Sequence, residues 1–371
     1  MKRYKYIISG GGTGGHIYPA IAIAQEIQRR NSEDEILFVG ARDRMEMQKV
    51  PQTGFTIRGL WISGFQRRLT LKNLWVPLKV IISLVQSLFL IQSFRPDVVI
   101  GTGGFASGPL LWMASLLGIP TLIQEQNSYP GVTNKLLAKR ARKICVAYPH
   151  MERFFPKSKL LLTGNPVRQD LLCQMTDSIN SSTHFELPER YDHRKVTGGG
   201  LILLVLGGSL GARRINKLVA EKLQWFQAHG VSLIWQCGNY YYPEYKGLSN
   251  AQVRILPFID NMAHAYKAAD IIISRSGALS VSELALVGKP VLFIPSPNVA
   301  EDHQTKNAEA LVNQNAALML KEQALEAEFD DIFGRLIDDG DYRQALGNSI
   351  KSTAMPQATS DIVDHIKSAS S

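Results

Sequence analysis

Two segments of this sequence share one order, in which a short apolar run leads into glycines and then into a helical pattern. The first spans Tyr6 to Gly15 and the second spans Leu204 to Gly211. An apolar run without polar alternation is typical of a strand buried on both faces of a parallel sheet. Because a glycine turn between strand and helix opens a Rossmann-type unit, the chain is predicted to form two Rossmann-like α/β domains that face a cleft.

The rest of the chain continues this alternation, as expected for parallel sheets with helices on both faces. Its 371 residues suffice for two such domains. The predicted strands are residues 6–9, 36–39, 98–100, 121–123, 144–147, 160–162, 201–206, 232–236, 253–256, 271–274 and 291–294. The clearest predicted helices are residues 20–30, 110–117, 213–227 and 279–287.

A polar stretch divides the pattern. Residues 175–200 show neither strand nor helix periodicity and end in three glycines, which is typical of a surface insertion or linker. We therefore expect an N-terminal domain over residues 1–163 and a C-terminal domain over residues 164–345 that carries the insertion. Residues 346–371 are expected to form a helical segment that packs back toward the N-terminal domain.

The composition is that of a soluble enzyme, with 45% hydrophobic and 20% charged residues. The net charge of +9 is unevenly divided. Up to Thr163, 22 Lys and Arg stand against 9 Asp and Glu, a net of +13, whereas the remainder has a net of −4. The first half is therefore expected to meet an anionic partner, and no recognised nucleic-acid motif accompanies the charge. Three distant cysteines favour a reducing compartment over a disulfide framework or a zinc site.

One segment mixes apolar and basic residues in a way that suits the surface of an anionic membrane. An amphipathic core helix with a basic outer face is the alternative interpretation. The next stretch, residues 80–94, is uncharged but shorter than the ~20 apolar residues of a spanning helix, so we expect the chain to lie against a membrane without crossing it. The patch residues are Trp61, Phe65, Arg67, Arg68, Lys72, Trp75 and Lys79.

Two glycine loops mark the expected binding surface of the first domain. Residues 10–15 follow a strand and open a helix, where free N–H groups and the helix dipole attract phosphate. The loop contains GxGxxG, so a dinucleotide-binding dehydrogenase is an alternative, although the next strand ends in Gly40-Ala-Arg without a carboxylate for a ribose.

Residues 101–108 form the second loop. His16, directly after the first loop, is a candidate general base or a helix-terminal residue bonded to backbone.

The third glycine loop allows a different chemistry. Residues 207–211 match GxSxG between a strand and a helix, so Ser209 could be a hydrolase nucleophile, with Asp270 and His303 following in triad order. Asp270 stands at the start of its predicted strand, whereas a triad acid belongs at the carboxyl end. The hydrolase is kept as an alternative.

Polar residues also follow the later strands. Arg275 and the loop 276–280 come after strand 271–274, at the edge where ligands bind open sheets. Glu283 falls in the first turns of the next helix, where it could complement the dipole or accept two ribose hydroxyls. Gln304 and Asn307 share one helix face. The Asp-Gly-Asp pattern at 339–341 is interpreted as a solvated turn rather than a metal site.

Together these motifs resemble the MurG family of glycosyltransferases, glycosyltransferase family 28. The combination is specific, although each piece alone is not. In family order, from about Tyr4 to Ile350, the chain carries Gly-Gly-Thr-Gly-Gly-His at 11–16, the loop 101–109, Glu125-Gln-Asn127, Gly164-Asn-Pro-Val-Arg168, the loop 207–212, Arg275–Glu283, and His303-Gln304 with Asn307.

The resemblance implies a GT-B fold and an inverting transferase. Such an enzyme moves N-acetylglucosamine from UDP-N-acetylglucosamine to the 4-hydroxyl of the muramyl sugar of undecaprenyl-diphosphate-linked lipid I, which forms lipid II for peptidoglycan. The N-terminal domain would face the acceptor and the membrane, and the C-terminal domain would bind the UDP-sugar. No cofactor or metal is implied, and the enzyme would be peripheral at the cytoplasmic face of the bacterial inner membrane.

The resemblance also carries the family's site residues onto this sequence. Glu283 would hold the ribose, Ser209 and Arg168 would lie near the diphosphate, and Gln304 near the sugar. Gly12, Gly103, Gly104 and Phe105 would face the acceptor diphosphate, with His16 as candidate base. The implied donor site comprises Thr13, Gly14, Gly15, Asn127, Arg168, Ser209, Ile259, Ala278, Leu279, Ser280, Val281, Ser282, Glu283 and Gln304.

Two positions depart from the family pattern. Phe105 stands where family members often have Tyr, so a hydroxyl contact is lost there. Leu210 stands where Gln is common in the third loop.

Overall fold

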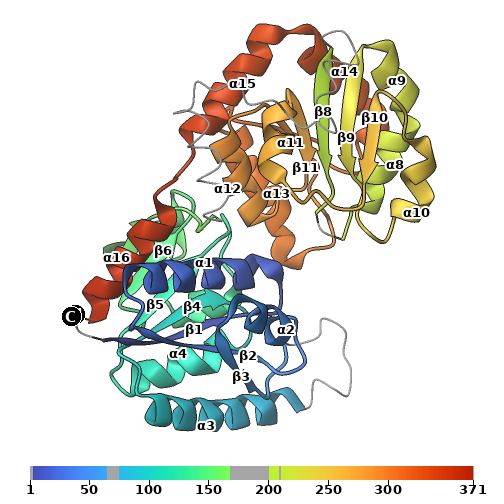
Figure 1. Cartoon of the computed structure of the whole chain (residues 1–371). Coiled ribbons are helices and arrows are strands. Elements are labelled where there is room, and N and C mark those ends of the chain that lie inside the picture. The colour runs from blue at the N-terminus through green and yellow to red at the C-terminus, as the bar shows by residue number, and fades with distance from the viewer. Residues whose placement is uncertain (1–2, 65–74, 168–199, 209, 371) are drawn as a thin grey trace. The chain divides into compact units, whose positions relative to one another are not determined.

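The computed structural model of the chain describes residues 3–64, 75–167, 200–208 and 210–370 (Figure 1). It divides into two units. The N-terminal unit comprises Met1–Val167 together with Met355–Ser371, and the C-terminal unit comprises Arg168–Ala354. Each unit is a parallel sheet covered by helices, as the repeated strand–glycine–helix pattern predicts.

The sheet of the N-terminal unit has the order β3-β2-β1-β4-β5-β6-β7, and every pairing in it is parallel. The central strands β1 and β4 are almost wholly buried, which explains why their sequences lack polar alternation. The strands are β1 (Lys5–Gly10), β2 (Glu35–Ala41), β3 (Thr56–Leu60), β4 (Val98–Gly103), β5 (Thr121–Glu125), β6 (Lys143–Val146) and β7 (Leu160–Leu162).

Helices pack on the faces of this sheet (Figure 1). Two of them, α1 and α4, begin directly after the first and second glycine loops. The helices are α1 (Gly14–Arg30), α2 (Glu46–Lys49), α3 (Val76–Phe94), α4 (Ser107–Leu116), α5 (Val132–Leu137) and α16 (Ala358–Ser370), with 3-10 turns at Pro51–Thr53, Met151–Arg153 and Lys157–Lys159.

The C-terminal unit repeats the design, with a second parallel sheet of order β10-β9-β8-β11-β12-β13. Its strands are β8 (Leu201–Leu206), β9 (Val231–Gln236), β10 (Val253–Leu256), β11 (Ile271–Ser274), β12 (Val291–Phe293) and β13 (Leu318–Met319). Its helices are α8 (Arg213–Glu221), α9 (Leu223–Ala228), α10 (Tyr242–Tyr245), α11 (Met262–Ala268), α12 (Ala278–Val287), α13 (His303–Val312), α14 (Leu325–Asp338) and α15 (Gly340–Ser352), with 3-10 turns at Lys246–Leu248 and Ala300–Asp302.

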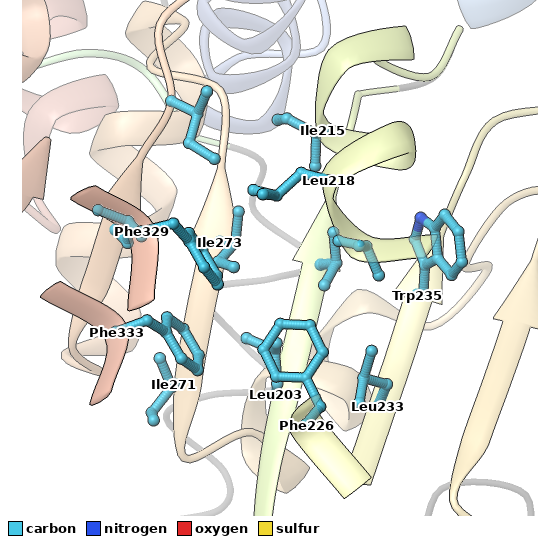
Figure 2. Packing of buried hydrophobic residues seen from close by; sticks show 14 of the residues in the cluster. Leu203, Ile215, Leu218, Phe226, Leu233, Trp235, Ile271, Ile273, Phe329 and Phe333 are labelled. Atoms are coloured by element: carbon cyan, nitrogen blue, oxygen red, sulfur yellow. The ribbon is translucent and has the colours of Figure 1, made fainter. Parts of the chain in front are cut away.

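Aliphatic and aromatic side chains together fill the core on one side of this second sheet (Figure 2). Phe329 and Phe333 on α14 stack with ring centroids 5.2 Å apart, and Phe226 meets both rings edge to face. The indole of Trp235 donates to Asn216 Oδ1 at 3.0 Å, so its buried N–H has a partner. This packing makes the sheet a rigid base for the loops at its strand ends.

Each predicted strand corresponds to an observed one, with ends that differ by a few residues. The structure adds β3 and β13, which the sequence analysis missed. β3 is an edge strand with alternating exposed residues, and β13 has only two residues, so neither has a long apolar run. The predicted helix 213–227 is two helices, α8 and α9, that meet at Lys222.

Helix α3 is the feature that departs most from expectation. Among the described residues, α3 is the one helix whose length and apolar composition would allow it to cross a membrane; the test considers length and composition only. The uncharged stretch 80–94 alone is shorter than a membrane-spanning helix. The helix is longer than that stretch because it begins at Val76. Its buried positions are Ser83, Ser87 and Ile91, whereas large apolar side chains point outward. The alternative of a core helix with a basic outer face concerned residues 61–79, most of which lie outside the described residues.

Five exposed apolar side chains, four of α3 and that of its N-cap residue Trp75, are here called the α3 face: Trp75, Leu78, Ile81, Val85 and Phe89. From Leu78 onward their spacing of three or four residues places them on one side of the helix. Phe89 is 66% exposed and Ile81 59%. The neighbouring α4 adds exposed Trp112 and Leu116. Single exposed apolar residues are ordinary, but several large ones on one side of a helix are not.

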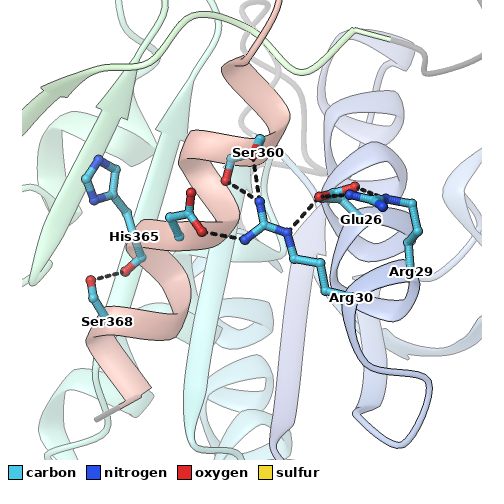
Figure 3. A network of polar contacts seen from close by, with 7 residues as sticks. Glu26, Arg29, Arg30, Ser360, His365 and Ser368 are labelled. Carbon is cyan, nitrogen blue, oxygen red and sulfur yellow. Dashed lines mark hydrogen bonds and ion pairs between the residues drawn. The ribbon is translucent and has the colours of Figure 1, made fainter. Parts of the chain in front are cut away.

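The last helix of the chain, α16, completes the core of the N-terminal unit. Ile362, Val363, Ile366 and Ala369 are buried among side chains of α1, β1 and β4. A polar network fixes the helix at its outer edge (Figure 3). The Arg30 guanidinium donates to Glu26 Oε1 at 2.7 Å and to Ser360 Oγ at 2.7 Å, and it also pairs with the carboxylate of Asp364.

Glu26→Gln is expected to lower the free energy of unfolding by about 1–2 kcal/mol at pH 7, because hydrogen bonds to a buried carboxylate are lost. Bonds from Arg29 and Arg30 hold the pKa of Glu26 below its ordinary 4.5, and burial opposes them. This contribution is therefore complete above pH 4.5 and disappears as the pH falls through the lowered pKa. Urea unfolding at pH 7 and pH 3 measures it, with the exposed Glu33→Gln as control. A difference between wild type and Glu26→Gln that persists undiminished at pH 3 would contradict the assignment.

Candidate functional site

The first glycine loop leads from β1 into the N-terminus of α1. Thr13 is exposed at the N-cap position, and within the described residues its side chain makes no capping hydrogen bond. Its carbonyl accepts the N–H of His16 at 3.1 Å. Free N–H groups and the positive end of the dipole at such a helix start attract an anion. The backbone of Thr13, Gly14 and Gly15 is thus arranged as expected for a phosphate-binding turn.

The second glycine loop lies directly against the first. Gly11 N–H donates to Gly103 O at 3.2 Å. Gly103 and Gly104 have φ values of +103° and +92°, and a Cβ on Gly104 would overlap the carbonyl of Gly11. Only glycine allows both the positive φ and this approach. The two loops therefore form one surface of the N-terminal unit, and the ring of Phe105, 41% exposed, lies beside Gly12.

A buried carboxylate that the sequence analysis missed holds this surface in place. Glu46 is fully buried, and its two oxygens accept the N–H of Gly12 and the N–H of Ala41, each at 3.0 Å. A carboxylate does stand at the tip of β2, contrary to the sequence-based expectation, because α2 supplies it. Both oxygens are engaged with backbone, so Glu46 positions the loop and does not present a ribose acceptor to solvent.

His16 points its ring toward the second loop. A Cβ on Gly103 would lie 2.8 Å from the ring, so glycine leaves room for the imidazole there. Nδ1 of His16 lies 2.9 Å from Gln126 Oε1, and Thr102 Oγ1 donates to the His16 carbonyl at 2.7 Å. The side chain is half-buried, and Gln126 holds the ring while Thr102 holds the backbone, as expected of a positioned acid or base.

The segment after β5 is organised by Glu125, which is buried. One of its oxygens accepts from the backbone N–H of Asn127 at 3.0 Å, and the other accepts from Asn134 Nδ2 at 2.8 Å and from Gly131 N–H at 3.1 Å. Glu125 thereby closes the loop that carries Gln126 and Asn127. Asn127 remains half-buried at the strand end.

The C-terminal unit contains a cavity of about 630 Å³ at the start of α8. The third glycine loop leads into this helix, which places its N–H groups and positive dipole end at the cavity. Three basic side chains of α8 reinforce the attraction for an anion. The lining residues are Gly207, Gly211, Ala212, Arg213, Arg214, Lys217, Arg275, Ser296, Asn298, Gln304 and Glu322.

The opposite wall of the cavity is built from the ends of β11 and β12. Arg275 pairs with Glu322 at 2.6 Å and donates to the Ile294 carbonyl at 2.9 Å. Gln304 Oε1 accepts the N–H of Ser296 at 2.8 Å, which fixes the loop after β12. Asn307 is buried and donates to the Ser276 carbonyl at 3.3 Å, so Gln304 contacts the loop after β12 and Asn307 the loop after β11.

Two predicted features of this unit differ in the structure. The predicted loop 276–280 ends earlier, because α12 already begins at Ala278, and the side chains of Ala278 and Val281 are buried. Glu283 stands in the second turn, where Tyr266 Oη donates to it at 3.5 Å, so it does not complement the first-turn dipole. Ile259 is buried and its N–H donates to Gln236 Oε1 at 2.9 Å.

Comparison with known proteins decides the family. The model of the glycosyltransferase family 28 N-terminal domain matches residues 6–146, and that of the C-terminal domain matches residues 202–339. Together these models match well over half of the chain. The chain belongs to glycosyltransferase family 28.

Family-28 relatives cover nearly the whole chain. It is 58% identical to a protein of Flavobacterium psychrophilum over 99% of this chain and 98% of the relative, and 54% identical to one of Christiangramia forsetii over 98% and 97%. Both are UDP-N-acetylglucosamine–N-acetylmuramyl-(pentapeptide) pyrophosphoryl-undecaprenol N-acetylglucosamine transferases. The crystal structure of Acinetobacter baumannii MurG shares 29% identity and superposes with a TM-score of 0.78 over 99% of this chain and 100% of that one. The GT-B fold class is thereby confirmed.

Family 28 is a family of transferases, and neither alternative chemistry fits the described geometry. Asp270 directly precedes β11, and its Oδ2 accepts the N–H of Ile202 at the start of β8 at 2.9 Å. A triad acid belongs at the opposite, carboxyl end of its strand. A dinucleotide would need a carboxylate at the tip of β2 to bind its ribose. The carboxylate there, that of Glu46, is buried and accepts two backbone N–H groups instead. Asp339 accepts the N–H of Tyr342 at 2.8 Å and so caps α15, which explains the Asp-Gly-Asp pattern without a metal.

Not every residue of the predicted donor site and membrane patch lies within the described residues. Phe65, Arg67, Arg68, Lys72, Arg168 and Ser209 fall outside them, as does most of the 175–200 insertion. In the N-terminal unit the structure brings together Gly12, Thr13, His16, Gly103, Gly104 and Phe105. In the C-terminal unit Gln304 lines the cavity, whereas Ile259, Leu279, Ser280, Ser282 and Glu283 lie outside its set of lining residues.

Proposed function

We propose that this protein transfers N-acetylglucosamine from UDP-N-acetylglucosamine to the 4-hydroxyl of the muramyl sugar of lipid I, forming lipid II. One observation carries the assignment, namely 58% identity across 99% of the chain to a transferase of that name. An anion-attracting surface in each unit supports it, since donor and acceptor both contain a diphosphate.

The donor is assigned to the cavity of the C-terminal unit. The N–H groups at the start of α8, with Arg213, Arg214 and Lys217, suit the diphosphate of UDP, and Gln304 suits the sugar. Ala278 and Val281 would contribute backbone only, because their side chains face the core. Glu283 would accept the ribose hydroxyls. The rest of the proposed donor set is Thr13, Gly14, Gly15, Asn127, Arg168, Ser209, Ile259, Leu279, Ser280 and Ser282.

The acceptor is assigned to the paired glycine loops of the N-terminal unit. In the proposed reaction the muramyl 4-hydroxyl oxygen attacks the anomeric carbon on the face opposite UDP. Its proton passes to His16 while the bond from the anomeric carbon to the diphosphate oxygen breaks and UDP leaves with the electron pair. Backbone N–H groups and arginines aimed at the diphosphate would stabilise the charge that develops there.

A UDP-release assay tests this function directly. Purified protein, UDP-N-acetylglucosamine and a lipid I analogue should yield one UDP per disaccharide product. The assignment fails if no product forms with a preparation that binds UDP and that is folded by circular dichroism. Protection against thermal unfolding by NADH without protection by UDP would instead support the dehydrogenase alternative.

We further propose that the α3 face lies on the inner leaflet as a peripheral contact. A helix whose apolar side chains point outward while serines face the protein suits the boundary between headgroups and acyl chains. Basic residues flank it: Lys79 Nζ lies 5.5 Å from the Trp61 ring and Arg140 lies 4.3 Å from the Trp112 ring. The net of +13 up to Thr163 favours anionic lipid. A lipid-linked acceptor would meet the enzyme there.

The double variant Ile81→Glu/Phe89→Glu is expected to lose most binding to phosphatidylglycerol vesicles, because two charges would enter the apolar layer. Vesicle co-sedimentation measures the bound fraction, and phosphatidylcholine vesicles report the electrostatic share. Leu248→Glu, at an exposed leucine of the C-terminal unit, is the matched control and should bind as wild type. Unchanged binding of the double variant would exclude the α3 face as the membrane contact.

A further inference from the structure

Behind His16 lies a chain of three buried side-chain amides. Gln126, Gln124 and Asn165 are each at most 2% exposed. Gln126 meets the imidazole at one end, and Asn165 closes the chain against the backbone of the loop after β5. The two ends of an amide look alike by shape, so the hydrogen-bond partners must decide which end is NH2 and which is oxygen.

Backbone carbonyls decide the direction, because a carbonyl only accepts. The terminal nitrogen of Gln126 donates to Thr102 O at 2.8 Å and to Gln124 O at 3.0 Å, so that end must be NH2. Asn165 Nδ2 likewise donates to Gln126 O at 3.0 Å.

The links between the side chains agree with this direction. Asn165 presents its oxygen to Gln124 Nε2 at 3.0 Å, and Gln124 presents its oxygen to Gln126 Nε2. Reversing any one amide would place NH2 against NH2 or oxygen against a carbonyl. The three orientations therefore support one another.

The oxygen of Gln126 is consequently the group that faces His16, at 2.9 Å from Nδ1. An amide oxygen only accepts, so in the neutral imidazole the hydrogen must sit on Nδ1 and the lone pair on Nε2. We propose that Gln126, oriented by Gln124 and Asn165, fixes His16 as its Nδ1–H tautomer and is a positioning residue for the transfer reaction. The tautomer stands independently of the activity, whereas the positioning role rests on the proposed function.

In the Nδ1–H tautomer, His16 can accept a proton on Nε2. The Nδ1 side of the ring faces Gln126, and the Thr102 hydroxyl holds the backbone of His16 on the first turn of α1. Rotation of the ring by a half-turn would place a carbon against the Gln126 oxygen and lose this bond. A neutral histidine that carries its proton on Nδ1 offers Nε2 as the only basic atom, so the amide chain selects which nitrogen can receive the proton of the sugar hydroxyl.

Nitrogen NMR of the full-length protein, labelled with ¹⁵N in histidine side chains, tests the tautomer. At a pH where the ring is neutral, His16 should show a protonated-type Nδ1 and an unprotonated-type Nε2, and His16→Ala assigns the signals by their loss. His229 is the internal reference, since its Nδ1 lies 2.8 Å from the Trp225 carbonyl and must carry hydrogen. A wild-type His16 protonated on Nε2 would overturn the proposal, and this result needs no variant to fold.

Gln126→Met tests the positioning role, because it keeps the length of the side chain and removes the acceptor. We expect His16 to populate both tautomers and kcat to fall about 10- to 100-fold, with KM for UDP-N-acetylglucosamine unchanged. Wild-type kcat in a variant that has lost the tautomer would reject the positioning role. If the wild type releases no UDP but shows the Nδ1–H tautomer, the proposed function fails and the tautomer stands. Gln52→Met, at an exposed glutamine, controls for the substitution itself.

Discussion

His16→Ala is expected to lower kcat for UDP release by about 10²- to 10⁴-fold, the range that a positioned general base contributes. The loss should fall on kcat and leave the KM for UDP-N-acetylglucosamine near its wild-type value, because His16 belongs to the N-terminal unit and the donor cavity to the other. Steady-state kinetics with a lipid I analogue measures both constants.

The exposed His229 provides the matched control, since His229→Ala removes an imidazole from the C-terminal unit without touching either glycine loop. Its kcat should equal that of the wild type. Undiminished turnover in His16→Ala would remove His16 as the base, while a rise in KM alone would assign it to binding.

Gly104→Ala is expected to reduce kcat/KM by about 100-fold, because a displacement of the order of 1 Å at a reacting centre has effects of that size. The added Cβ would overlap the carbonyl of Gly11, so the two glycine loops must move apart. The hydrogen bond from Gly11 N–H to Gly103 O would be lost with them. The same UDP-release assay, corrected for the folded fraction, measures the effect.

The chain contains a glycine that separates strain from overlap. Gly54 has a φ of +85°, close to that of Gly104, but a Cβ there would meet nothing within 4 Å. Gly54→Ala should therefore lose about 1–2 kcal/mol of stability from the left-handed backbone while keeping its activity. Equal loss of activity in both variants would show that backbone strain, and not the contact between the loops, is responsible.

The sequence predicted those parts of the site that local patterns encode. Each glycine loop follows a buried strand, and this order alone located Gly12, Gly103 and the start of α8. Gln304 and Asn307 followed from helical spacing. In each case the chemistry depends on backbone N–H groups or on one helix face, and neighbouring residues determine both.

Contacts between distant segments could not be predicted in this way. Gln126 meets His16 across 110 positions of sequence, and no local pattern records that distance. Glu46 reaches the tip of β2 from a short helix, so the strand end itself carries no sign of the carboxylate. The exposure of α3 was hidden because the sequence of a largely apolar helix does not show which of its faces the neighbouring elements cover.

The docking of α16 has a consequence for how the molecule is made. Residues Met355–Ser371 belong to the N-terminal unit, and Ile362, Val363 and Ile366 are part of its core. These residues are synthesised after the whole C-terminal unit, so the N-terminal unit completes its core only once the C-terminal unit has been made. The C-terminal unit is continuous in sequence and can fold as soon as it emerges. Deletion of the last helix is therefore expected to leave the nascent N-terminal unit as a substrate for chaperones and proteases.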